Sequence, residues 1–255
     1  MQGIELLSID LSNYCTKQCD FCYNHSSRQG NVKWATQEVI GFAKDCIAHG
    51  VKAVSLGGGE PFEYDGVFEI IRELQPVVYL SVTSNGLPLD NENVRRQLLA
   101  SPPDKIHITI HQADDEWEVD RVLRQIVWLA DTGIKPGVNL LVPASKIKFC
   151  TRVYQRISKQ LKPDQIILVP QRFSDSPTPK QLAEVAGGQP FQSPSCLLKC
   201  VPPQNFCSVS WDKRVNFCSY AGGKQPLTTL DFAGLTAALE RVRFASCCKE
   251  SSEER

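Results

Sequence analysis

Short apolar runs rich in β-branched residues alternate with segments of helical period along most of the first 170 residues, and this alternation restricts the fold. It is typical of βαβ units, in which helices connect parallel strands. Six strands with right-handed crossovers make most of a barrel, but not a closed eight-stranded one. The sequence therefore predicts an α/β fold built as a partial (β/α)6 barrel of parallel strands. The candidate strands are residues 4–11, 53–56, 77–83, 105–110, 137–142 and 165–169, and the candidate helices are residues 36–49, 65–74, 91–99, 115–130 and 149–160.

Three cysteines follow the first candidate strand, and their spacing lets one loop aim all three thiolates at one point. They are Cys15, Cys19 and Cys22, in the segment C-T-K-Q-C-D-F-C. A cubane iron-sulfur cluster held entirely by protein needs four thiolates, and the next cysteine, Cys46, lies in a helical segment. One iron is therefore expected to stay open, as in catalytic metal sites. The alternatives are a zinc site or a ferredoxin-like cluster completed by a distant cysteine.

A glycine-rich segment follows the second candidate strand. It reads Gly57-Gly58-Gly59-Glu60-Pro61. Glycines have no Cβ and let a backbone approach a ligand closely, and the Glu60 carboxylate is an acceptor suited to an ammonium group. A plain strand-end turn is the alternative interpretation.

The two motifs together resemble the radical S-adenosylmethionine (SAM) superfamily, whose signature is C-x3-C-x-aromatic-C followed by a Gly-Gly-Glu-Pro loop. Phe21 occupies the aromatic position. The resemblance implies that the three cysteines hold a [4Fe-4S] cluster and that the amino and carboxylate groups of SAM chelate its open iron. It also implies that the loop from Gly58 to Pro61 binds the methionine amino group.

Polar residues also occur where the later strands end. In parallel α/β folds, ligands bind at the carboxyl ends of the strands. Ser84 and Asn85 follow the third strand and look like the Thr-Asn-Gly of many family members, which implies a place near the methionine or ribose of SAM. Thr109 and His111 end the fourth strand, and Asn139 lies in the fifth. The alternatives for these residues are turn formers or hydrogen-bonded inward polar groups.

Composition gives no support to several other classes of function. The 255 residues contain 28 basic and 28 acidic side chains, so net charge gives no indication of binding to nucleic acid. No segment has the length and apolar character of a membrane span or a secretion signal, and we expect a cytoplasmic protein. In a reducing compartment, metal ligation explains the 11 cysteines better than disulfides do.

The composition changes after the sixth strand, where prolines and glycines concentrate. We expect residues 1–173 to form the partial barrel, residues 174–199 to form a Pro/Ser/Gly-rich linker and residues 200–255 to form a small Cys-rich domain. In that domain, residues 205–211 and 214–220 read as a β-hairpin and residues 227–242 as a helix. The linker is expected to be irregular rather than another βα unit.

The carboxy-terminal cysteines are candidates for a second metal site, because a hairpin and a helix bring the ends of this region together. The region resembles the "twitch" appendage of radical SAM enzymes, a short form of the SPASM domain, which implies one auxiliary [4Fe-4S] cluster. A structural zinc ion is the alternative. The predicted ligands are Cys200, Cys218, Cys247 and Cys248, with Cys196 or Cys207 as replacements for one of the adjacent pair. Cys46 and Cys150 lie in helical segments and are expected to be buried apolar residues.

The resemblance implies reductive cleavage of SAM to a 5′-deoxyadenosyl radical, which abstracts hydrogen from a small-molecule or peptide substrate. An auxiliary cluster would accept the electron left on the substrate radical and make the net reaction an oxidation, or alternatively it would anchor or shape the substrate pocket. A flavodoxin- or ferredoxin-type protein would supply electrons to the first cluster. The alternatives are an activating enzyme for a glycyl radical enzyme and a non-catalytic iron-sulfur electron carrier.

Overall fold

The computed structural model describes residues 3–194 and 197–247. In this part of the chain, nine strands form one sheet in the order β6-β5-β4-β3-β2-β1-β7-β8-β9. The strands are β1 (Leu6–Asp10), β2 (Ala53–Gly57), β3 (Tyr79–Ser84), β4 (Lys105–Ile110), β5 (Lys135–Val142), β6 (Ile166–Pro170), β7 (Phe206–Val209), β8 (Arg214–Asn216) and β9 (Gln225–Pro226). The α-helices are α1 (Thr36–Ala48), α2 (Val67–Leu74), α3 (Glu92–Ala100), α4 (Glu116–Asp131), α5 (Ile147–Ile157), α6 (Pro179–Val185) and α7 (Phe232–Glu240).

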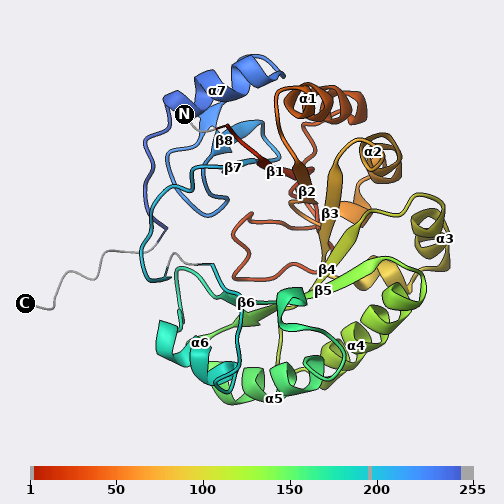
Figure 1. The fold of residues 1–255 in the computed structure, drawn as a ribbon, viewed down its shortest axis with the longest axis vertical. Helices are drawn as coiled ribbons and strands as arrows, with labels where there is room; N and C mark the ends of the chain where they lie inside the picture. The colour runs from red at the N-terminus through yellow and green to blue at the C-terminus, as the bar shows by residue number, and fades with distance from the viewer. Residues whose placement is uncertain (1–2, 195–196, 248–255) are drawn as a thin grey trace, which may run out of the picture.

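Strands β1 to β6 are all parallel, and each pairs with the next strand of the sequence. Figure 1 shows the sheet curving, with the helices on its outer side from α7 and α1 round to α6. Because β6 does not pair with β7, β8 or β9, the sheet stays open between its two ends. The α/β fold with a parallel, unclosed sheet is therefore confirmed.

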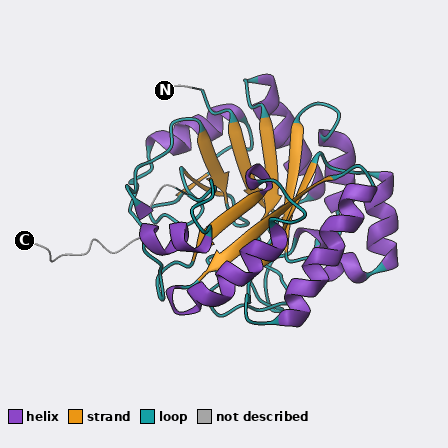
Figure 2. Ribbon diagram, turned by 60° about the horizontal axis from the view of Figure 1, so that its bottom comes forward, coloured by secondary structure: helices purple, strands orange, loops and turns teal. Residues whose placement is uncertain are grey.

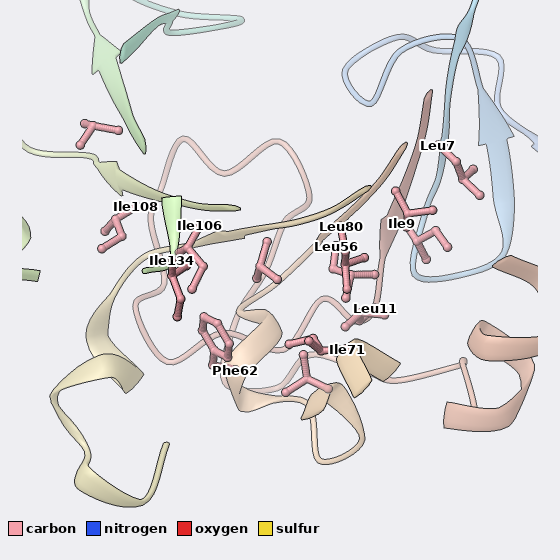
Figure 3. Packing of buried hydrophobic residues seen from close by; sticks show 14 of the residues in the cluster. Leu7, Ile9, Leu11, Leu56, Phe62, Ile71, Leu80, Ile106, Ile108 and Ile134 are labelled. Atoms are coloured by element: carbon pink, nitrogen blue, oxygen red, sulfur yellow. The ribbon is translucent and has the colours of Figure 1, made fainter. Parts of the chain in front are cut away.

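The two faces of the sheet differ in polarity because side chains alternate along each strand. One set is apolar, fully buried and faces the helices, as Ile9, Leu56 and Leu80 do. Figure 3 shows these side chains in the same buried cluster as Phe62 and Ile71. The alternate positions hold Ser8, Ser55 and other small polar residues, which lie on the inner side of the curve. The fold therefore separates an apolar core from a polar interior.

Helix α6 lies within the segment that the sequence predicted to be irregular, so that part of the prediction was wrong. Thr178 caps the helix, because its Oγ1 accepts a hydrogen bond from Gln181 N (3.2 Å) and its N–H donates to Gln181 Oε1 (2.8 Å). Pro179 occupies the first turn, where its missing N–H carries no cost. This Thr-Pro-x-Gln sequence is a capping signal that outweighs the surrounding prolines and glycines. Strand β6 thus has a following helix, as the five strands before it do.

The carboxy-terminal hairpin extends the main sheet. Strand β7 pairs in parallel with β1, from Leu6 opposite Phe206 to Ile9 opposite Val209, and β8 and β9 follow in antiparallel order. Helix α7 packs nearby, and its first residue Phe232 donates its N–H to Asp45 of α1 (2.7 Å). Figure 2 shows the strands enclosed by helices and loops. Strand β1 is therefore an interior strand.

Among the described residues, no helix combines the length and the apolar character that crossing a bilayer requires.

Candidate functional site

A cavity of about 280 Å³ opens at the carboxyl ends of the parallel strands. Its floor is the polar inner face of the sheet, and its walls are the loops that follow the strands. Residues of all six strands from β1 to β6 line the cavity, including Val169 and Pro170 of β6. They also include Ser8 and Asp10 of β1, Ser55 and Gly57 of β2, Thr83 and Ser84 of β3, Thr109 of β4, and Asn139 and Leu141 of β5. The cavity thus lies where parallel α/β folds bind ligands.

The loop after β1 brings Cys15, Cys19 and Cys22 to this cavity, and all three line it. Asn85 Nδ2 donates to Cys15 Sγ at 3.5 Å. Burial raises the pKa of the Cys15 thiol, and it raises that of Cys19 to about 12, although the Lys17 ammonium opposes the rise for Cys19. Thiolates at these positions therefore need a positively charged partner such as a metal.

Two carboxylates hold the segment between the first two cysteines. Glu63 accepts hydrogen bonds from Thr16 N (3.0 Å) and Thr16 Oγ1 (2.5 Å). Glu118, at the start of α4, accepts one from Lys17 Nζ at 2.9 Å. These contacts join the cysteine loop to two other elements, so its conformation is fixed by the protein around it.

The glycine loop packs against the cysteine loop. Gly59 N donates to Ser12 O (2.7 Å), and Glu60 N donates to Tyr14 O (2.9 Å). A Cβ on Gly59 would lie 1.9 Å from Tyr14 O, and one on Gly58, whose φ is +111°, would lie 2.6 Å from Ser12 O. Glycine is therefore required at these two positions because the backbone of the glycine loop lies close to the backbone of the cysteine loop. Gly57, Gly58 and Gly59 also line the cavity.

Glu60 lies beneath the loop after β3, and its side chain is only 1% exposed. Its Oε1 accepts hydrogen bonds from Ser84 Oγ (2.8 Å) and Phe62 N (3.2 Å), and its Oε2 accepts one from Asn85 N (2.7 Å). Burial raises the pKa of this carboxyl to about 7, against the effect of these hydrogen bonds. Glu60 thus sets the positions of Ser84 and Asn85. Pro61 is buried beside it and begins the short 3-10 helix η1 (Pro61–Glu63).

Glu118 forms a buried polar cluster with Lys17 and His111 and is 1% exposed. His111 N donates to Glu118 Oε1 (2.8 Å), and His111 Nδ1 lies 3.5 Å from the same oxygen. Burial alone would raise the pKa of Glu118, but the hydrogen bonds from His111 and Lys17 hold it at about 2. Phe21 of the cysteine motif stacks on His111, with ring centroids 6.1 Å apart. This cluster anchors the cysteine loop to α4 and β4.

The structure brings most of the predicted site residues to one cavity. The residues that line it are Cys15, Cys19, Cys22, Gly58, Gly59, Ser84, Asn85, Thr109 and Asn139, together with His111. Glu60 and Pro61 are not among the lining residues and support the cavity from below. Asn139 Oδ1 also lies 2.9 Å from Nδ1 of the buried His107.

Several residues that line the cavity were not predicted from the sequence to be site residues. They include Asp10, Lys17, Tyr23, Gln171 and Tyr220. Asp10 ends β1 and is 2% exposed. Burial raises its pKa to about 6, although the charge of Lys224 opposes this. A signal for Asp10 was present, because Ser8 and Asp10 alternate with apolar residues in β1. No local sequence pattern identifies Tyr220, which follows β8, as a lining residue.

The donor set of the cavity fits an iron-sulfur cluster with one open iron. Three cysteines line the cavity, and the described lining residues include no fourth. Within residues 3–194 and 197–247, no three His, Cys, Asp or Glu side chains lie close enough to hold a single metal ion. A cubane cluster gives each thiolate a separate iron and does not require such closeness. The cavity beside the thiols provides room and polar groups for a ligand on the open iron.

The carboxy-terminal cysteines differ in their surroundings. Cys207 is fully buried in β7, and it, Cys46 and Cys150 belong to the apolar core. Cys46 and Cys150 are thus buried, as predicted. Cys200, Cys218 and Cys247 are partly exposed, and a bridge between Gly222 and Ala245 brings the segments that contain Cys218 and Cys247 side by side. Cys196 and Cys248 lie outside the described residues.

The chain is similar in sequence to a known family and to several curated proteins. The sequence model of the Radical SAM superfamily matches residues 9–136, which is half of the chain and includes the cysteine and glycine loops. A protein of Methanocaldococcus jannaschii named probable GTP 3′,8-cyclase is 29% identical over 157 residues, which are 57% of this chain and 52% of that protein. A protein of the same name from Methanocella arvoryzae is 28% identical over 142 residues, 52% of this chain and 46% of its own. The chain thus spans about half the length of these curated relatives.

Solved structures share the fold at low sequence identity. The structure of SuiB from Streptococcus suis bound to the precursor peptide SuiA has a TM-score of 0.66 and 14% identity, covering 86% of this chain and 60% of its own. The structure of anSMEcpe with bound AdoMet and the Cp18Cys peptide has a TM-score of 0.64 and 14% identity, covering 94% and 82%.

Proposed function

The chain belongs to the radical SAM superfamily, and from that membership we propose an enzyme that cleaves SAM reductively and abstracts hydrogen from a small-molecule or peptide substrate. The observation that carries the proposal is one cavity lined together by the three cysteines, the glycine loop and the polar ends of the strands. When bound, the cluster supplies the electron that splits SAM into methionine and a 5′-deoxyadenosyl radical.

In this proposal the cysteine loop holds the [4Fe-4S] cluster through Cys15, Cys19 and Cys22. The Asn85 amide, 3.5 Å from Cys15 Sγ, donates to a cluster ligand and so influences the electron density on that sulfur. Lys17 places a positive charge beside Cys19 and favours its thiolate. The buried loop contacts to Glu63 and Glu118 keep the three thiols oriented before the cluster is inserted.

The remaining predicted residues bind and orient SAM. The backbone of Gly58 and Gly59 borders the cavity next to the cysteines, where the methionine amino group would bind. Ser84, Asn85, Thr109 and Asn139 offer hydroxyl and amide groups for the other polar groups of the cofactor. Glu60 and Pro61 act indirectly, since Glu60 fixes Ser84 and Asn85 through hydrogen bonds of 2.8 and 2.7 Å. Holding SAM in one orientation aims its adenosyl carbon at the substrate.

The substrate and the net reaction form the finer part of the proposal. The sequence relatives are named for the cyclisation of GTP, and the SuiB structure contains a precursor peptide. Both a small molecule and a peptide therefore remain candidate substrates. We propose that a flavodoxin- or ferredoxin-type protein supplies the electrons.

We also propose that residues 200–255 form a twitch-like domain with an auxiliary [4Fe-4S] cluster, which would make the net reaction an oxidation. The bridge from Gly222 to Ala245 supports a site that includes Cys218 and Cys247, because it aligns the segments on which they lie. Cys200 and Cys248 complete the proposed set. The full burial of Cys207 in the core argues against it as the replacement ligand. Residues 1–173 remain the proposed barrel domain and residues 174–199 the connecting segment.

The central experiment measures SAM cleavage. Protein reconstituted with iron and sulfide under anaerobic conditions, reduced with dithionite and mixed with SAM should form 5′-deoxyadenosine and methionine. A variant with alanine at Cys15, Cys19 and Cys22 should form neither, whereas the Cys150→Ala control, which removes a buried core thiol, should retain the activity. Equal product from the triple variant and the wild type would refute the proposal. A cluster-loaded wild type that binds no SAM but exchanges electrons reversibly would indicate an electron carrier.

Counting iron and sulfide tests the auxiliary site. Two clusters require about eight irons per chain. The double variant Cys200→Ala, Cys218→Ala should lose about four of them and keep SAM cleavage to 5′-deoxyadenosine. The Cys46→Ala variant, which removes a core thiol, is the matched control and should keep all of them. About four irons in the wild type, or zinc in the native mass spectrum, would contradict the auxiliary cluster.

A further inference from the structure

An aromatic and cationic wall crosses the open side of the curved sheet. Tyr23 directly follows the last cysteine of the motif, Tyr220 follows β8, and Arg172 follows β6. The rings of Tyr23 and Tyr220 lie 4.8 Å apart, and the Arg172 guanidinium lies over the Tyr220 ring at 5.3 Å from its centroid. These contacts connect the two ends of the sheet, which no strand pairing joins. All three residues line the cavity.

Arg172 brings a permanent positive charge to this wall. Its side chain is only 5% exposed, yet it belongs to the lining of the cavity. The other described lysine or arginine of the lining is Lys17, whose ammonium forms an ion pair with Glu118 at 2.9 Å. Burying a guanidinium is costly, and a charged ligand that enters the same space offsets part of that cost.

The place of the guanidinium over the Tyr220 ring suits it to one class of ligand. A ring that lies against a planar guanidinium covers its face, whereas the N–H donors project from its edge. An edge of this kind binds carboxylate or phosphate oxygens in pairs. The Tyr220 ring thus holds the Arg172 guanidinium at the cavity.

The position of Arg172 separates it from the proposed methionine end of SAM. The glycine loop and Asn85 follow β2 and β3, while Arg172 follows β6, and β4 and β5 lie between them in the sheet. We infer that Arg172, held by Tyr220, binds an anionic group of the substrate, a carboxylate or a phosphate, at the side of the cavity opposite the glycine loop. This inference rests on the proposed function and names the substrate class of the same site.

Binding of small anions tests the inference without knowledge of the substrate. Cluster-loaded, SAM-saturated protein is titrated calorimetrically under anaerobic conditions with inorganic phosphate and, separately, with succinate, at constant ionic strength. At least one of them should bind saturably to the wild type. Arg172→Gln should weaken that binding about tenfold or more, because a charge-assisted pair of hydrogen bonds is lost. Arg124→Gln, the same change on the exposed face of α4 and outside the cavity lining, should leave it unchanged.

Two further variants keep the test decisive if Arg172→Gln does not fold. Arg172→Lys keeps the charge but loses the paired donors, so we expect intermediate binding. Tyr220→Leu removes the stacked ring and should weaken anion binding about threefold or more. Circular dichroism establishes which of the variants are folded.

Each outcome of the anion titration either supports or overturns the role of Arg172. Binding of phosphate but not succinate assigns a phosphate group, and the reverse assigns a carboxylate. Failure of the wild type to bind either anion, or equal binding by the wild type and Arg172→Gln, overturns the inference. A loss of SAM affinity in Arg172→Gln with unchanged anion binding also overturns it, because Arg172 would then hold the methionine carboxylate. Absence of 5′-deoxyadenosine from the wild type refutes the proposed function, whatever the anion titration gives.

Discussion

At the scale of single residues, the cavity depends on buried carboxylates that hold loops in place. Glu60 joins the glycine loop to the loop after β3, and Glu118 joins the cysteine loop to β4 and α4. Both are 1% exposed. Removing one partner of a buried polar pair leaves the other uncompensated, which costs more than the pair itself contributes.

The first prediction concerns Glu118. Glu118→Gln leaves the Lys17 ammonium without its carboxylate, at a side chain only 16% exposed. We expect the free energy of unfolding to fall by about 3 kcal/mol, measured by urea denaturation of the cluster-free protein. Glu116→Gln is the matched control on the same helix, since Glu116 pairs with Arg156 at the surface and is 67% exposed. Its effect should stay within about 1 kcal/mol, and similar losses from both variants would contradict the assigned role of Glu118.

The second prediction concerns His107 and pH. Burial, with a smaller contribution from Lys105, lowers the pKa of His107 to about 4 from its ordinary value of 6.5. The unfolded chain therefore binds the proton first as the pH falls below about 6.5, and the native state loses stability between there and pH 4. The full difference corresponds to about 3 kcal/mol. His107→Gln should remove this contribution, so that between pH 7 and pH 5 the variant loses less unfolding free energy than the wild type. Parallel curves for the two proteins would contradict the shift.

At the scale of elements, the cysteine loop and the glycine loop form one unit. Two backbone hydrogen bonds join them, and the Gly59 position leaves no space for a side chain. A change in either loop is thus expected to displace the other.

The third prediction tests this coupling. Gly59→Ala places a methyl group against Tyr14 O and forces the loops apart, so we expect a loss of about 2 kcal/mol or more in unfolding free energy. Iron incorporation during reconstitution should fall with it. Gly41→Ala, in α1 with no atom within 4 Å of the added Cβ, should instead stabilise the protein by about 0.5 to 1 kcal/mol. Full iron content in Gly59→Ala would show that the loops are independent.

The strands and most helices were predictable because their signals are local. Apolar runs rich in β-branched residues located β1 to β6 within a few residues, and helical periodicity did the same for α1 to α5. The Thr-Pro-x-Gln signal for α6 is also local, but the prediction gave more weight to the surrounding prolines and glycines. Side-chain contacts between residues far apart in the sequence have no comparable local signal. Lys17 with Glu118, and Arg172 with Tyr220, are pairs that only the folded chain defines.

At the scale of the whole molecule, the carboxy-terminal hairpin completes the sheet. The sequence predicted the hairpin itself, but nothing in residues 206–216 indicates that β7 pairs with β1. That choice depends on the apolar sides of β7 and α7, where Cys207, Val209 and Leu235 are fully buried in the common core. The proposed division at residue 200 therefore crosses a shared core.

The fourth prediction concerns this shared core. A protease site introduced at Gly187-Gly188, which is exposed after α6, allows the folded chain to be cut without removing any residue. We expect the two fragments to co-elute in gel filtration and to separate only in denaturant. The fragment of residues 1–187, expressed alone, should aggregate or show no cooperative unfolding, because β1 loses a neighbour. A soluble fragment that unfolds cooperatively would instead support an independent barrel domain.

The pairing of β1 with β7 also bears on how the protein is made. Strand β1 is translated long before its second partner, β7, which begins at Phe206. At typical rates of translation the interval is on the order of ten seconds or more. Throughout that time the nascent chain presents the strand before its cysteine motif with one side unpaired. Insertion of a metal cluster during synthesis would therefore meet a sheet in which β1 still lacks β7.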